Sequence, residues 1–200
     1  DARMEILSIL NAHWKLEVMP EELELANVVT LYKKGNVEDP GNYRPISLLQ
    51  SIYKIYASLI QVRLADQLED KLWKTQYGFR KKRSTMQPLF VIRRLQYYAE
   101  SIGDPLVLQF LAWEKAFDKV DQRELIKAIE RLNIPDKMVR VLKSFYVNPQ
   151  FRIRDREGNS TYRKQRAGIR QGCLLSPYLF VMLMTVLFHD VHKEVDQKSK

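Results

Sequence analysis

The densest group of residues that could do chemistry is a basic loop at residues 76–83 (QYGFRKKR). It holds four consecutive cations, Arg80, Lys81, Lys82 and Arg83, and two aromatic residues, Tyr77 and Phe79. Basic side chains neutralise phosphates, and aromatic rings stack on bases. The 200-residue chain has 33 Lys and Arg against 24 Asp and Glu, a net charge of +9 that favours a polyanionic partner. The loop therefore indicates a nucleic-acid contact, with a solvated or nuclear-localisation segment as the alternative.

Two other groups of reactive residue types are weaker candidates. His189 and His192 flank Asp190 at a helical spacing that could hold a transition metal. Two imidazoles without a third ligand in register favour a polar helix end instead. Cys173 is the single cysteine, which excludes an intramolecular disulfide and fits a reducing compartment. We interpret it as a small buried hydrophobe rather than a nucleophile.

Helices dominate the elements that must position these residues. Helical spacing and capping signals predict helices at residues 2–18, 49–64, 84 onward, 121–132, 136–146 and 177 onward. Strand signals occur at residues 27–32, 105–111, 151–156 and 161–166, and residues 33–45 are rich in turn formers. The last two strands form a hairpin, on which Arg152, Arg154 and Arg156 either line a nucleic-acid groove or keep one face soluble. This order predicts an α+β fold with helices dominant and few short strands.

Four segments carry a further signal when they are taken together. They read NYRPISLL at 42–49, QYGFRKKRST at 76–85, FLAWEKAFDKV at 110–120 and GIRQGCLLSPYLF at 168–180. In this order and at these separations they resemble the reverse transcriptase domain of non-LTR (LINE-like) retrotransposons. The resemblance covers about residues 27–188 and implies a right-hand polymerase fold, of which this chain supplies the fingers and part of the palm. It also implies RNA-directed DNA synthesis by two Mg²⁺ ions held by aspartates.

The resemblance assigns six residues to the incoming nucleotide: Lys33, Lys34, Arg44, Phe117, Gln171 and Gly172. The cations would contact the triphosphate, since Arg offers a planar fork and Lys a mobile point charge. Phe117 would exclude a 2′-hydroxyl sterically, or else simply pack a strand–helix junction. Gln171 and Gly172 would contact the nucleotide through an amide and a close backbone approach. The same resemblance lays residues 80–83 against the template.

The chain departs from the family pattern at the metal site. The family has F-L-D-x-x-K-A-F-D, whose first Asp binds metal, and Ala112 occupies that position here. A methyl group cannot coordinate Mg²⁺, and Glu114 is displaced by two residues. The family's Y/F-x-D-D hairpin is also missing, because no two aspartates are adjacent in the sequence. We therefore expect no intact catalytic residue set, no productive Mg²⁺ binding and no polymerase activity.

The expected organisation is a lead-in helix over residues 1–26 and a partial reverse transcriptase domain over residues 27–200, cut before the D-D hairpin. The apolar face of its last helix should remain partly exposed. The implied partners are an RNA template, a DNA primer or RNA–DNA duplex and deoxynucleotides, with no membrane. We expect a nuclear location, with the cytoplasm as the alternative. Two other interpretations stay open: a segment of a longer, active polymerase, or a non-enzymatic nucleic-acid-binding or protein-interaction module.

Overall fold

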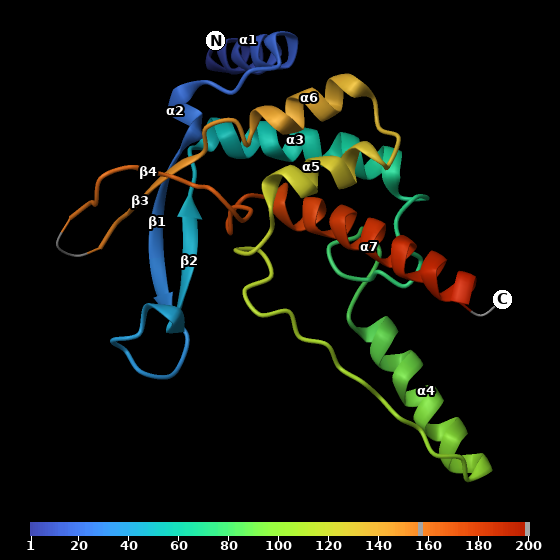
Figure 1. Ribbon diagram of the computed structural model, residues 1–200. Helices are drawn as coiled ribbons and strands as arrows, with labels where there is room; N and C mark the ends of the chain where they lie inside the picture. The colour runs from blue at the N-terminus through green and yellow to red at the C-terminus, as the bar shows by residue number, and fades with distance from the viewer. Residues whose placement is uncertain (156–157, 199–200) are drawn as a thin grey trace.

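A computed structural model describes residues 1–155 and 158–198 as a mixed α+β fold (Figure 1). Its seven α-helices are α1 (Ala2–Leu16), α2 (Glu21–Glu24), α3 (Ser51–Leu68), α4 (Met86–Ile102), α5 (Gln122–Glu130), α6 (Asp136–Ser144) and α7 (Ser176–Lys198). Its strands are β1 (Leu25–Tyr32), β2 (Tyr43–Leu48), β3 (Gln150–Ile153) and β4 (Arg163–Lys164), and a 3-10 turn, η1, covers Pro40–Asn42. The predicted α+β class with dominant helices is therefore confirmed.

The four strands form one mixed sheet in the order β2-β1-β3-β4. β1 pairs antiparallel with β2 from Asn27↔Leu48 to Tyr32↔Tyr43. On its other side β1 pairs parallel with β3, starting at Leu25↔Gln150, and β4 closes the sheet antiparallel to β3. The β1–β2 hairpin is buried only near its base, so its far end projects into solvent.

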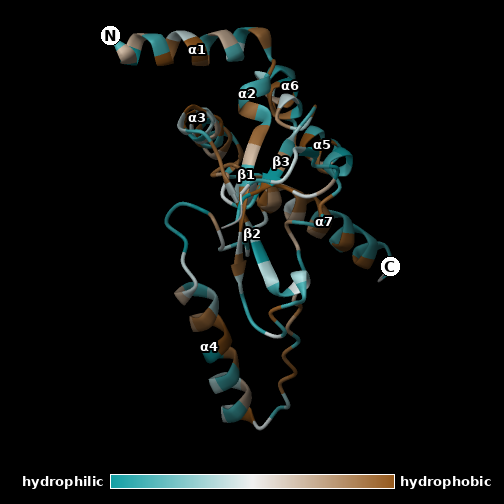
Figure 2. Ribbon diagram, turned by 90° about the vertical axis from the view of Figure 1, so that its left-hand side faces the viewer, coloured by the Kyte–Doolittle hydropathy of each residue, from teal (hydrophilic) through white to brown (hydrophobic). Residues whose placement is uncertain are grey.

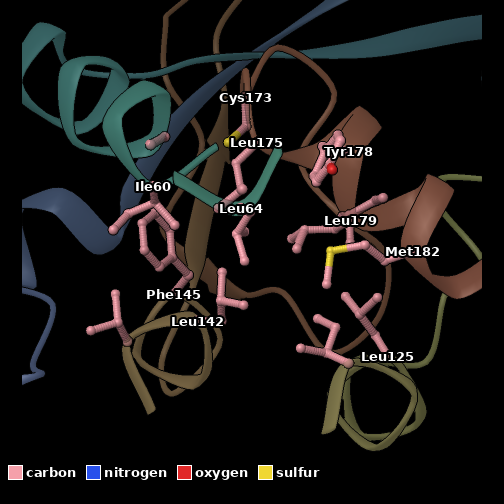
Figure 3. Close-up of a cluster of buried hydrophobic side chains, with 14 of the residues drawn as sticks. Ile60, Leu64, Leu125, Leu142, Phe145, Cys173, Leu175, Tyr178, Leu179 and Met182 are labelled. Carbon is pink, nitrogen blue, oxygen red and sulfur yellow. The ribbon is translucent and has the colours of Figure 1, made fainter. Parts of the chain in front are cut away.

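The main core lies where α3, α5, α6 and α7 meet (Figure 3). Side chains from all four helices point toward one another there, and these are almost fully buried: Ile60, Leu64, Leu125, Leu142, Leu179 and Met182. α5 begins as predicted, because the Asp121 carboxylate accepts hydrogen bonds from the backbone N–H groups of Arg123 and Glu124 at 2.8 and 3.1 Å. This core fixes the positions of α5, which follows the segment at residues 110–120, and of α7, which begins within the segment at residues 168–180.

α4 and residues 104–113 form an arm that projects from this core (Figures 1 and 2). No residue of α4 is buried. The strand predicted at residues 105–111 is wrong: the segment has no strand structure, and Val107 and Phe110 are 88% and 78% exposed. A strand requires a neighbouring backbone to accept and donate its hydrogen bonds, and none lies beside this segment within the described parts of the chain.

One other expectation needs correction. Residues 43–45, predicted as the end of a turn-rich segment, form strand β2 together with residues 46–48, for which no element was predicted; Pro45 is tolerated because β2 is an edge strand of the sheet. The apolar face of α7 is partly exposed, as expected, because Val181 and Val186 are buried, while Leu187 and Phe188 are 37% and 38% exposed. No helix among the described residues is both long enough and apolar enough to cross a membrane.

Candidate nucleotide and nucleic-acid site

Three of the four diagnostic segments, those at residues 42–49, 110–120 and 168–180, are joined by hydrogen bonds just before α7 begins. The backbone N–H of Ser47 in β2 donates to the carbonyl of Gln171 at 2.7 Å. The Gln171 side chain donates through Nε2 to Asp118 Oδ1 at 2.8 Å. The structure therefore brings Ser47, Asp118 and Gln171 together from positions far apart in the sequence. Spacing along the chain gave no sign of the Asp118–Gln171 hydrogen bond, which only the co-occurrence of the segments could have suggested.

Two glycines permit this meeting. Gly172 has a φ of 110°, and a Cβ at this position would stand 2.5 Å from the Ser47 carbonyl oxygen. Gly168 has a φ of 79°, and its Cβ would stand 2.8 Å from the Asp118 carbonyl oxygen. Any larger residue would clash with backbone and adopt a strained conformation at both positions. Gly172 thus makes a close approach to strand β2, and its predicted approach to a nucleotide stays a prediction.

Beside this meeting point lies a hollow of about 190 Å³. Its lining includes Pro45, Ser47, Asp118 and Gln171. Phe117 is not among the lining residues. Its half-buried ring stacks on Phe180 of α7, with centroids 5.0 Å apart and planes 19° apart. This contact supports the packing alternative for Phe117, and the predicted exclusion of a 2′-hydroxyl stays a prediction.

The cations predicted to hold a triphosphate lie at the far end of the β1–β2 hairpin. Lys33 and Lys34 follow β1, and Arg44 pairs with Leu31 in the sheet register. All three cations are exposed. Because side chains alternate along a strand, Arg44 faces the opposite side of β2 from Pro45, which lines the hollow. The structure thus groups the three cations with one another and not with Gln171.

Arg80 is the one member of the basic loop that is buried, with a side chain 3% exposed. Its Nε and Nη2 donate to Glu69 Oε1 at 3.1 and 2.6 Å. Nη2 also donates to the Glu69 carbonyl at 3.2 Å, and Nη1 donates to the carbonyls of Trp73 and Gln76 at 3.0 and 3.2 Å. These bonds use all five N–H donors of a guanidinium. The geometry therefore argues against the predicted nucleic-acid contact of Arg80, which ties the loop to α3 instead.

The other three cations of the loop are exposed. Lys81 Nζ lies 3.3 Å from Asp66 Oδ1 in a solvent-exposed ion pair. The Arg83 guanidinium stands 5.6 Å from the centre of the Tyr77 ring. Lys82 lines a hollow of about 330 Å³ that also contains Phe79 and Tyr178. Lys81, Lys82 and Arg83 are therefore available to a phosphate backbone.

The three arginines predicted on the β3–β4 hairpin, Arg152, Arg154 and Arg156, are not equally available to a nucleic acid. Arg152 Nε donates to Asn27 Oδ1 at 2.6 Å, and its guanidinium lies 4.9 Å from the Tyr162 ring centre. Arg154 is exposed. Arg156 lies outside the described residues. Since Arg152 already has two partners within the protein, the predicted groove lining depends on Arg154 alone among the residues described.

The residues around position 112 do not fit a Mg²⁺ ion. Ala112 is exposed in the arm and offers no side-chain oxygen. The Glu114 carboxylate pairs with Lys119 at 3.2 Å, and the Asp118 carboxylate accepts from Gln171. Across residues 1–155 and 158–198, no three His, Cys, Asp or Glu side chains are grouped so that they could hold a metal. The described side chains therefore offer no ligand set for a metal ion at this position.

The histidines near the end of α7 pack against an aromatic ring. His189 and His192 stand edge-on to Trp73, with ring centroids 5.0 and 5.2 Å apart. Asp190 between them accepts from both terminal nitrogens of Arg131, which lowers the pKa of that carboxyl. Cys173 is buried, and its Sγ lies 3.6 Å from the Tyr53 hydroxyl, which donates to it. These contacts agree with the interpretation of both features as structural.

Comparison with known proteins points to one family. The family described as reverse transcriptase (RNA-dependent DNA polymerase) matches residues 31–199. A probable RNA-directed DNA polymerase from transposon BS of Drosophila melanogaster is 33% identical, over 86% of this chain and 19% of that protein. The RNA-directed DNA polymerase from mobile element jockey of the same species is 29% identical, over 100% of this chain and 22% of that protein. A Pol polyprotein from the type-1 retrotransposable element R2 of Popillia japonica is 26% identical, over 74% and 21%. The chain spans about a fifth of the length of these relatives.

Proposed function

This chain belongs to the reverse transcriptase family, among relatives of the non-LTR retrotransposon polymerases, and we propose that it forms the nucleotide- and template-binding part of an RNA-directed DNA polymerase. The observation that carries the proposal is the meeting of Ser47, Asp118 and Gln171, because it joins segments that the family resemblance alone had linked. In this proposal the β1–β2 hairpin belongs to the fingers, and α5, α6 and α7 belong to the palm.

The exposed cations supply the binding chemistry. Lys33, Lys34 and Arg44 at the hairpin end would contact a triphosphate, since each carries a solvated charge that can reach a phosphate oxygen. Lys81, Lys82 and Arg83 would contact the template backbone. Gln171 is held by Asp118, so its backbone and side chain keep a fixed orientation toward the hollow beside β2. Arg80 takes no part in binding and keeps the loop in place.

Catalysis is the part of the family's activity that we propose this chain lacks. Mg²⁺ supplies the family's phosphoryl-transfer chemistry by activating the primer hydroxyl and stabilising the leaving group. Ala112 replaces a ligand of that ion, and the carboxylates of Glu114 and Asp118 are engaged elsewhere. Residual function would then be salt-sensitive binding of nucleic acid. The division at residues 26 and 27 and the nuclear location stay predictions.

The binding proposal can be tested by fluorescence anisotropy with a labelled RNA–DNA primer–template. The variant Lys81→Ala/Lys82→Ala/Arg83→Ala should bind more weakly, and its slope of log K against log salt should fall by about 0.7–0.9 for each phosphate that the variant no longer neutralises. The control Lys15→Ala/Lys193→Ala/Lys198→Ala removes the same charge from exposed positions elsewhere and should change the slope little. An affinity that ignores both salt and the loop variant would refute nucleic-acid binding here and favour a protein-interaction module.

The catalytic proposal has its own test. We expect no primer extension by the purified chain on an RNA template with deoxynucleotides and Mg²⁺. Extension above the protein-free control would show that Ala112 does not abolish the activity, and it would leave the binding proposal intact.

A further inference from the structure

A basic hollow lies between α5, α6 and the β3–β4 hairpin, and none of the binding residues that the family resemblance implies lines it. Its volume is about 640 Å³. Five cations line it: Arg123, Lys127, Lys143, Lys164 and Arg166. Only two carboxylates, those of Asp121 and Glu130, line it with them, so the hollow carries an excess of three positive charges. Its floor includes Tyr146, which is half-buried.

The cations of this hollow differ in what they contact. Lys127 Nζ pairs with Glu124 Oε1 at 2.7 Å, and Lys143 Nζ pairs with Glu130 Oε1 at 2.7 Å. The side chains of Arg123, Lys164 and Arg166 make no hydrogen bond or ion pair with any residue that the structure describes, and all three are exposed. The fold thus gathers three unpaired cations, from the start of α5 and from β4 and the residues after it, around one concavity.

The carboxylates at the rim compensate these three charges only in part, since Asp121 attracts Arg123 without forming an ion pair with it. One oxygen of Asp121 accepts from two backbone N–H groups at the start of α5, which lowers the pKa of that carboxyl and keeps it in place as the helix cap. Glu130 is held by Lys143. Arg123, Lys164 and Arg166 line the same hollow and repel one another there, and a bound anion would offset that repulsion.

The hollow adjoins the candidate nucleotide site at one residue. Gln165 lines both this hollow and the 190 Å³ hollow beside Asp118 and Gln171. Its Nε2 donates to the carbonyls of Ala167 and Gly168 at 3.1 and 3.2 Å, so its position between the two is fixed. A strand lying in the basic hollow would therefore pass next to the hollow that Asp118 and Gln171 line.

We propose that this hollow is an accessory site for the phosphodiester backbone of a single-stranded nucleic acid. An enclosed site for one phosphate would have buried, converging donors, whereas these three cations are exposed and spread along an open surface, as contacts to successive phosphates require. The site adds to the proposed function a second nucleic-acid contact, independent of the basic loop at residues 81–83. RNA and DNA share the backbone chemistry that the site recognises.

The affinity test uses the full chain with labelled single-stranded RNA and DNA. The variant Arg123→Ala/Lys164→Ala/Arg166→Ala should lower affinity and reduce the salt slope by about 2, since each single-strand phosphate contact contributes about 0.7. The matched control Arg3→Ala/Lys15→Ala/Lys193→Ala carries the same change in net charge and should leave the slope nearly unchanged. Thermal unfolding of the variants establishes that each is folded, and an unchanged slope in the folded hollow variant would overturn the proposal.

A crosslinking test locates the contact and separates this site from the basic loop. A photoreactive benzoylphenylalanine in place of Val147, an exposed residue of the hollow, should crosslink to labelled RNA. The same probe in place of Met4 on α1 should not. The Val147 crosslink should persist in Lys81→Ala/Lys82→Ala/Arg83→Ala and disappear in the hollow variant. The assignment to a nucleic-acid strand would be overturned if the probe at position 147 gave no crosslink. It would also be overturned if an equal concentration of tripolyphosphate abolished the crosslink. Loss of binding only in the loop variant would support the proposed template site and refute this one.

Discussion

The four-helix core and the arm formed by α4 and residues 104–113 have similar apolar content and opposite surroundings. Leu125 and Ile129 of α5 are completely buried, whereas Phe90 of α4 is 65% exposed and no residue of α4 is buried. Capping interactions nevertheless mark the ends of both α4 and α5. Gln87 Oε1 accepts from the Ser84 N–H at 3.0 Å before α4, and Gly103 ends it with a φ of 72°. Local capping signals thus decide where a helix forms, and distant segments decide whether it is buried.

The largest difference between the two regions should appear in their response to truncated apolar side chains. Leu125→Ala removes a fully buried side chain and should lower the free energy of unfolding by about 2–5 kcal/mol. Phe90→Ala removes a larger side chain from the arm and should change it by no more than about 0.5 kcal/mol. Urea unfolding followed by circular dichroism measures both. A comparable loss in Phe90→Ala would mean that the arm is packed in solution.

A smaller effect is expected where the core meets the arm. Arg80→Ala would leave Glu69 and three carbonyl groups without their donor, which should cost about 1–3 kcal/mol. Lys81→Ala removes only an exposed ion pair and should cost less than about 1 kcal/mol. Limited proteolysis should also show faster cleavage at residues 74–83 in Arg80→Ala. Equal stability and equal cleavage in the two variants would contradict the structural role of Arg80.

The smallest expected effect is the loss of stability of the core at low pH. Arg131 holds the pKa of Asp190 below the ordinary value of 3.8, so the pair contributes stability above that pH and loses it as the pH falls below it. No ion pair found among the described residues involves the arm, residues 86–113. Acidification should therefore lower the melting temperature of the core slightly, and Asp190→Asn should show less of this loss. An unaltered acid dependence in Asp190→Asn would remove the pair from the explanation.

The elements that the sequence could predict are those with local signals. The cap at Asp121 and the apolar spacing of Leu125 and Ile129 identified α5 correctly. Residues 105–111 carry an equally clear apolar run, but a strand depends on a partner backbone that the sequence of the segment does not specify. β2 was missed because Pro45 and the preceding turn formers masked a pairing that only β1 supplies.

The candidate site shows the same division. The four segments and their order could be recognised from the sequence, and three of them do meet in the structure. The basic loop could not be divided in advance into a buried residue, Arg80, and its exposed neighbours, because burial depends on Glu69 and on carbonyls elsewhere in the chain. The cations of the basic hollow between α5, α6 and the β3–β4 hairpin were missed for a related reason: Arg123 lies far from Lys164 and Arg166 in the sequence and lines the same hollow only through folding.

The parallel pairing of β1 with β3 also has a consequence for synthesis. Asn27 of β1 binds Arg152 of β3 across 125 positions, and the buried Arg170 guanidinium donates to the carbonyls of Leu23 and Glu24. While the chain emerges from the ribosome, β1 can pair with β2 at once but must wait for β3 until most of the sequence has been translated. Such distant contacts slow folding and leave apolar surface open to aggregation in the meantime. Nascent chains halted before residue 150 should therefore need chaperones more than chains that already include β3 do.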